Sequence, residues 1–112
     1  MEQGDIYIAD FDEAGMRPAV VVSRDELNRG HSILMVPFTS QNLDVRRNLP
    51  TCVLFRRGEF GLNKDCVAQC DAAARLNKRW IELPKVGKLD ALTLRSVINA
   101  IGDVIAAECE PV

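Results

Sequence analysis

The feature that most constrains this chain is a series of short apolar segments, each bounded by polar or turn-forming residues. The longest apolar runs are PAVVV and ILMVPF, and β-branched and aromatic residues recur in the segments, as in β-strands. Pro37, near the end of one segment, predicts a sheet edge or a bulge, because proline cannot donate to a strand ladder. We expect strands in six segments, at residues 5–10, 18–23, 32–38, 51–55, 66–71 and 78–83.

The spacing of apolar residues changes over residues 89–108. Apolar side chains recur there at intervals of three and four, which predicts an amphipathic helix, and Asp90 is placed to cap its first turn. No linker or internal repeat divides the chain, so residues 1–112 are expected to form one domain. The prediction is a mainly β (α+β) domain: a small barrel of about five to six strands with one C-terminal helix.

Composition bears on the cellular setting and on metal binding. No apolar run approaches the ~20 residues that span a bilayer, and MEQGDIY at the N-terminus lacks the basic and apolar regions of a signal peptide. We therefore expect a cytoplasmic protein with no membrane partner. The four cysteines are expected to stay reduced and to serve as small buried side chains. With His31 as the single histidine, no metal site is expected.

Charge is distributed unevenly along the chain. The net charge is −2 overall, made up of −5 over residues 1–45, +6 over residues 46–95 and −3 over residues 96–112. A basic region of this kind suits a polyanion or an acidic partner. Alternatively, its charges only solvate outer strand faces and loops, and composition does not separate the two interpretations.

Polar side chains mark the ends of several predicted strands. Arg17 precedes the second strand, Thr39 and Ser40 follow the third, and Asp71 ends the fifth. If these ends converge at one rim of the barrel, an arginine, a hydroxyl and a carboxylate suit phosphodiester chemistry: the arginine binds growing phosphate charge and the carboxylate handles a proton. The alternatives are structural: Arg17 marks the strand start, Thr39 caps its own turn, and Asp71 caps a turn.

The order of several motifs is characteristic. The segments GDIYIADF, GMRPAVVVS, VPFTSQ, LPTCV and GLNKDCVAQCD, followed by the final helix, resemble the MazF/PemK family of endoribonuclease toxins from type II toxin–antitoxin systems. The resemblance runs from Gly4 to about Ile105. It implies an SH3-like barrel of the CcdB/MazF type, a homodimer, and metal-independent, sequence-specific cleavage of single-stranded RNA without a cofactor. The 2′-hydroxyl of the RNA attacks, and the product carries a 2′,3′-cyclic phosphate.

The resemblance also implies partners and site residues. The partners are single-stranded mRNA, a cognate antitoxin with an acidic, partly disordered tail, a second copy of the chain, and operator DNA only through the antitoxin. The implied catalytic residues are Arg17, Thr39 and Asp71. The candidate RNA-binding residues are Ser40, Gln41, Arg46, Arg47, Gln69 and Arg75.

The sequence departs from the family pattern in several places. Only FDEAGM separates Asp10 from Arg17, where many members have a loop of about a dozen residues, and Glu13 is a candidate substitute for a loop carboxylate. Cys66 stands where serine is usual, and Gln69 where some members have a catalytic arginine. Two alternatives therefore stay open. One is a CcdB-like toxin that binds DNA gyrase through the C-terminal helix and the AAECEPV tail, and the other is an inactive member that binds only antitoxin or RNA.

Overall fold

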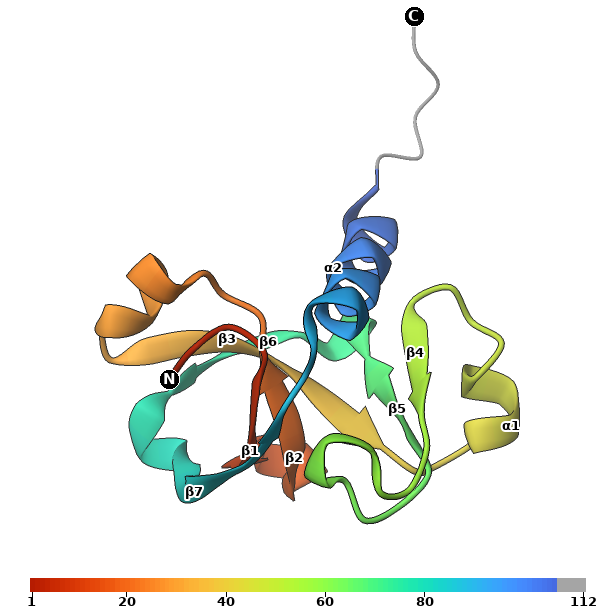
Figure 1. Cartoon of the computed structure of the whole chain (residues 1–112), viewed down its shortest axis with the longest axis horizontal. Coiled ribbons are helices and arrows are strands. Elements are labelled where there is room, and N and C mark those ends of the chain that lie inside the picture. The colour runs from red at the N-terminus through yellow and green to blue at the C-terminus, as the bar shows by residue number, and fades with distance from the viewer. Residues whose placement is uncertain (107–112) are drawn as a thin grey trace, which may run out of the picture.

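The computed structural model describes residues 1–106 and shows a single antiparallel sheet with a C-terminal helix packed on it (Figure 1). The strands follow one another in the order β4-β5-β3-β2-β1-β7, and β6 pairs with β3 beside β5. Short 3-10 turns occupy several of the connections. The strands and helices are β1 (Asp5–Asp10), β2 (Met16–Val21), β3 (Ser32–Thr39), α1 (Leu43–Arg46), β4 (Cys52–Phe55), β5 (Cys66–Gln69), β6 (Ala74–Asn77), β7 (Ile81–Lys88) and α2 (Ala91–Ile105).

The predicted α+β class with a C-terminal helix is confirmed, although the last strand, expected at residues 78–83, is β7 (Ile81–Lys88), and the sheet differs in strand number and closure. The sheet has seven strands where six were expected, and the additional strand is β6, which pairs with Ser32–Met35 of β3. With four residues, β6 is too short to stand out in the sequence as a separate apolar segment. The ladder is also open: within residues 1–106, the terminal strands β4 and β7 do not pair, so the sheet does not close into a barrel.

Pro37 lies where β3 changes partner. Residues Ser32–Met35 pair with β6, whereas Phe38 and Thr39 pair with β5, so Val36 and Pro37 fall between the two ladders on this side. A residue without an N–H fits such an interruption. The expected irregularity in pairing is present, but β3 is a central strand and not a sheet edge.

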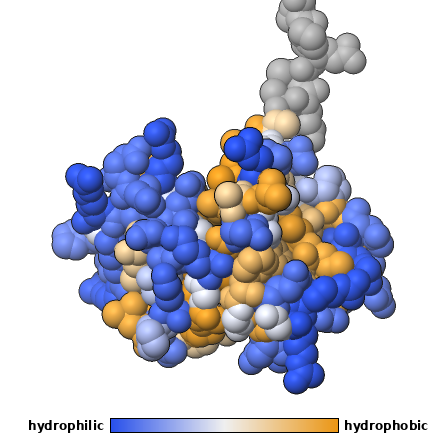
Figure 2. Space-filling view, viewed as in Figure 1, coloured by the Kyte–Doolittle hydropathy of each residue, from blue (hydrophilic) through white to orange (hydrophobic). Residues whose placement is uncertain are grey.

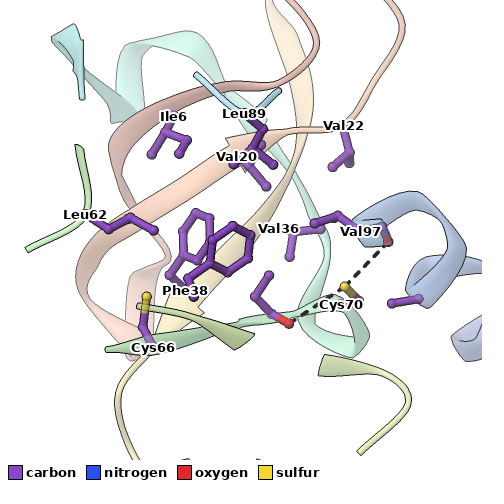
Figure 3. Packing of buried hydrophobic residues seen from close by; sticks show 13 residues of the cluster. Ile6, Val20, Val22, Val36, Phe38, Leu62, Cys66, Cys70, Leu89 and Val97 are labelled. Atoms are coloured by element: carbon purple, nitrogen blue, oxygen red, sulfur yellow. Dashed lines mark hydrogen bonds between the residues drawn. The ribbon is translucent and has the colours of Figure 1, made fainter. Parts of the chain in front are cut away.

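Buried side chains form a separate cluster on each face of the sheet. On the α2 side, Phe38 and Phe55 meet edge to face at 5.1 Å, and the Cys70 thiol donates to the carbonyl of Val97 at 3.7 Å (Figure 3). The opposite face buries Tyr7, Ala19, Met35 and Ile81, among others. This two-sided burial follows from the period-two alternation of the strands. Because both faces are covered, function must be sought at the ends of the strands or on the surface.

Helix α2 begins as the sequence predicts. The Asp90 carboxylate accepts from the backbone N–H of Thr93 at 2.8 Å, which caps the first turn. Hydrogen bonding by the Thr93 side chain, and then by its backbone N–H, lowers the pKa of Asp90. Val97 and Ala100 are buried against the sheet, whereas Leu92 and Ile105 stay exposed, and Figure 2 shows apolar residues gathered over α2 and beside it. Residues 107–112 lie outside the described residues, and they include Cys109, most of the AAECEPV tail and the last two residues of the helix expected over 89–108. In the part of the chain that is described, no helix has the length and apolar character needed to cross a membrane.

Candidate functional site

Arg17 and Thr39 come together at one end of the sheet. The β2–β3 ladder pairs Val21 with Met35 and ends at Ala19 with Pro37, and Arg17 and Thr39 lie two residues further along the same register. The start of β2 therefore lies beside the end of β3. Both side chains line one hollow of about 330 Å3, together with Ser40 and Gln41. We call this space the Arg17 hollow.

The Arg17 guanidinium is held at one point and unsatisfied at another. Its Nη2 donates to the carbonyl of Ala14 at 2.7 Å. Gly15, with φ at +78°, forms the turn that brings Ala14 under the guanidinium. The Arg17 Nε is buried and, among residues 1–106, has no hydrogen-bond partner. A buried charged donor without a partner is costly, and the side chain that carries it lines the hollow, so the positive charge of Arg17 favours an anion bound there.

Thr39 is 5% exposed, and its hydroxyl oxygen accepts from the backbone N–H of Gln41 at 3.2 Å. This contact agrees with the structural alternative given above, in which the Thr39 hydroxyl caps its own turn. It leaves the hydroxyl hydrogen free to donate to a ligand, because an O–H can accept and donate at once. The two interpretations of Thr39 are therefore compatible.

The far wall of the hollow comes from the segment between β4 and β5 and from the start of β5. It contributes Leu62, Asn63, Lys64 and Cys66. Figure 1 shows this segment reaching the ends of β1 and β2. The glycines and the asparagine of residues 56–65 predict turns, and no local pattern marks Asn63 or Lys64 as site residues. Their position depends on β5 pairing with β3, which local patterns do not reveal.

The electrostatic character of the Arg17 hollow is cationic. Arg17 and Lys64 line it, and none of its described lining residues is a carboxylate or a histidine. Cys66 is buried, and burial, followed by the charges of Asp65 and Glu59, raises the pKa of its thiol to about 11. The Cys66 thiol is therefore neutral at physiological pH. The hollow suits an anion and contains no side chain that titrates near neutrality.

Asp71 is not brought to the Arg17 hollow. It lies in the 3-10 turn Cys70–Ala72 that follows β5, and its side chain is exposed. Because β5 runs antiparallel to β3, with Val67 paired to Thr39, the chain moves away from Thr39 before it reaches Asp71. Its charge instead acts on Cys52, whose pKa is raised first by burial and then by Asp71.

The other candidate RNA-binding residues divide between regions. Ser40 and Gln41 line the Arg17 hollow. Arg46 on α1 donates to the side-chain oxygen of Gln69 on β5 at 3.4 Å, which ties these two candidates together. They do not line the hollow, and neither do two further positions, the exposed Arg47 and Glu13.

Arg75 belongs to a different surface. It lies on β6 opposite Leu34 and lines a second hollow with Phe11 and the half-exposed Trp80. Arg79 stacks its guanidinium 5.4 Å from the Trp80 ring centroid. The structure therefore separates Arg75 from Arg17 and Thr39, and its proposed role in RNA binding would need a surface other than the Arg17 hollow.

A family model now bears on these observations. The model for PemK-like, MazF-like toxins of type II toxin–antitoxin systems matches residues 2–105. The chain belongs to this family. The family resemblance seen in the sequence motifs is thus confirmed, whereas the roles of individual residues in the hollow stay predictions.

Solved structures of MazF toxins share the fold. The Mycobacterium tuberculosis toxin MazF-mt6 is 23% identical over 94% of this chain and 99% of its own, with a TM-score of 0.77. A mycobacterial endoribonuclease in complex with its cognate antitoxin is 20% identical over 99% of both chains, also at 0.77. MazF from Deinococcus radiodurans is 19% identical over 96% of this chain and 97% of its own, at 0.75. A comparison of the sequence with curated proteins finds no match.

Proposed function

We propose that this protein is a sequence-specific, metal-independent endoribonuclease toxin that cleaves single-stranded RNA. The observation that carries the proposal is the Arg17 hollow, which is lined by the Arg17 guanidinium-bearing side chain and by Thr39 with its hydroxyl, and by no carboxylate among the described residues. Family membership supports the same function. A phosphodiester suits this hollow, because its two non-bridging oxygens can accept from the Arg17 guanidinium and the Thr39 hydroxyl, and because the hollow is open enough to admit an RNA strand.

In the proposed reaction, the 2′-oxygen of the RNA attacks the adjacent phosphorus while the bond from phosphorus to the 5′-oxygen breaks. Arg17 binds the non-bridging oxygens, on which charge grows in the transition state, and Thr39 donates a further hydrogen bond. Water accepts the 2′-proton and supplies a proton to the departing 5′-oxygen. Asp71, predicted to hold Arg17 or to assist proton removal, lies outside the hollow, so this mechanism depends on Arg17 and Thr39.

The direct test uses purified protein, a long single-stranded RNA and excess EDTA. Cleavage is expected at a short recurring motif, with 2′,3′-cyclic phosphate ends identified by mass spectrometry of the fragments. Heat-denatured protein is the control for contaminating nuclease. Intact RNA, or cleavage that needs added Mg²⁺, would contradict the proposed mechanism.

The proposed partners follow from the same function. Two solved structures are of toxins with antitoxins, a mycobacterial endoribonuclease with its cognate antitoxin and MazE–MazF from Deinococcus radiodurans. For this chain we propose a cognate antitoxin with an acidic, partly disordered tail, which the +6 charge of residues 46–95 would attract, and contact with operator DNA only through that antitoxin. We also propose a homodimer. Light scattering of the purified toxin tests the dimer, and rescue of growth by a co-expressed neighbouring gene tests the antitoxin.

A further inference from the structure

We infer that Lys64 is a second phosphate-binding residue, which holds the RNA phosphate next to the one that is cleaved. This inference rests on the proposed function and adds a residue that determines how substrate binds. Lys64 lines the Arg17 hollow on the wall opposite β2, so one RNA backbone passing through the hollow meets both cations.

The charge of Lys64 is not used elsewhere in the described structure. Lys85 pairs with Asp5 at 3.3 Å, Lys88 pairs with Glu2, and Lys78 donates to a backbone carbonyl. Lys64 has neither an ion pair nor a hydrogen bond within residues 1–106, and no carboxylate lines its side of the hollow. It is therefore the lysine of the described chain that is free to bind an external anion.

The adjacent Asp65 does not cancel this charge, because it is engaged on its other side. Its carboxylate accepts from the backbone N–H of Arg57 at 2.8 Å and lies 3.9 Å from the Arg56 guanidinium. These contacts pin the chain directly after Lys64. Lys64 itself is exposed and lines the hollow.

The chain before Lys64 is pinned as well. Gly61, with φ at +86°, crosses β7 so closely that a Cβ atom would lie 2.2 Å from the carbonyl oxygen of Val86. The N–H of Gly58 donates to the carbonyl of Leu62 at 2.8 Å and closes the loop. With the backbone fixed on both sides, the flexible stem of Lys64 starts from a defined place on the rim of the hollow.

A lysine at this position acts as a point charge on a phosphate that does not react. The charge of that neighbouring phosphate is the same in the bound substrate and in the transition state. Lys64 therefore stabilises both states equally, which lowers KM and leaves kcat unchanged. This pattern separates Lys64 from Arg17, whose contact strengthens as the reaction proceeds.

The test compares Lys64→Gln with two matched variants. Lys64→Arg keeps the charge, and Arg95→Gln removes a charge from the exposed surface of α2, away from the hollow. The cleavage assay uses an RNA oligonucleotide that spans a mapped cut, and binding is measured with the same oligonucleotide carrying a 2′-deoxy sugar at the cut. For Lys64→Gln, KM and Kd are expected to rise about tenfold with kcat unchanged. The slope of log Kd against log salt should fall by about 0.7, the loss of one single-strand phosphate contact.

The outcomes separate this inference from the proposed function. If the wild type cuts RNA but Lys64→Gln behaves like Arg95→Gln, the role of Lys64 is wrong and the nuclease stands. The role is also overturned if kcat falls and the salt slope does not, or if Lys64→Arg fails to restore binding. If the wild type neither cuts the long RNA nor binds a mixed-sequence RNA pool, both proposals fail.

Discussion

The residues predicted to be catalytic lie near opposite ends of β5, and their environments differ. Arg17 and Thr39 lie near its start, whereas Asp71 follows its end. At its start, Cys66 forms part of a cationic hollow with Arg17 and Thr39, where a buried N–H lacks a partner. Just beyond its end, Cys70 is enclosed under α2, with the carbonyls of Ala68 and Val97 both within reach of its one S–H donor. Asp71 follows in an exposed turn.

This difference shows which end is suited to bind a ligand. At the Cys70 end, the thiol is enclosed beside backbone carbonyls, and burial raises its pKa to about 12, whereas the Asp71 carboxylate that follows faces solvent. At the Cys66 end, charge and hydrogen-bonding capacity are left over among the described residues. Charges and hydrogen-bond donors without partners around an open hollow favour ligand binding. A buried thiol with carbonyl acceptors under a helix favours a structural role.

The largest expected effect is that of Arg17→Gln. Removing the charged donor from the transition state should lower the single-turnover cleavage rate about 100- to 1000-fold. The fold should survive, because the Arg17 side chain makes one hydrogen bond, to Ala14, and lies at the end of a strand. Quantified cleavage of the mapped RNA and thermal melting of the variant measure the two quantities.

The same variant separates the nuclease from the gyrase-binding alternative. Expression of Arg17→Gln in cells should no longer arrest growth, whereas Arg95→Gln should remain toxic. Growth arrest by Arg17→Gln at the wild-type level would favour a CcdB-like toxin that acts through α2. It would also show that the Arg17 hollow is not the toxic site.

A smaller effect is expected for Thr39→Val, which keeps the shape of the buried side chain and removes the hydroxyl. Loss of a hydrogen bond to a charged phosphate should slow cleavage by about tenfold to a hundredfold. Thr39→Ser retains the hydroxyl and should keep most of the rate. If Thr39→Val cleaves normally, the hydroxyl only accepts from Gln41 and has no role in the reaction.

Asp71→Asn should change the cleavage rate by less than about twofold, because an exposed charge outside the hollow is screened by salt. Its local effect should be measurable: Asp71 helps to raise the pKa of Cys52, so its neutralisation should lower that pKa. The pH dependence of Cys52 alkylation reports this shift. A hundredfold loss of cleavage instead would show that Asp71 reaches the reacting groups in the functional assembly, and the proposed mechanism would then have to include it.

The contrast between Thr39 and Asp71 shows how far the sequence alone predicts the site. Arg17 and Thr39 could be placed together, because consecutive antiparallel strands put the start of one beside the end of the next. Asp71 also ends a predicted strand, but that strand pairs with β3 in the opposite direction and carries Asp71 away. Which strand lies beside β3 depends on contacts distant in sequence, and apolar patterning does not encode them.

Lys64 illustrates the same limit from the other side. Glycines and an asparagine correctly mark residues 56–65 as turns, but they do not show where the turns lie. That depends on Gly61 crossing β7, a contact between segments about 25 residues apart, for which the local signal is only a glycine. Likewise, patterning identified strands and the capped helix α2, but not that the ladder would stay open between β4 and β7.

The smallest expected effect on cleavage is that of replacing Cys66. This residue lies at the start of β5 and lines the Arg17 hollow, but we do not expect it to act as a nucleophile. A thiol with a pKa of about 11 is almost entirely protonated at pH 7.5, so its thiolate fraction is about 100-fold below that of an ordinary cysteine. Iodoacetamide should therefore label Cys66 at least that much more slowly in native protein than in urea, with the native rate rising as the pH increases toward 11. Peptide mass spectrometry measures both rates. Cys66→Ser should cleave RNA at close to the wild-type rate, whereas rapid native labelling or a large loss of activity would mean that the thiol contacts the substrate.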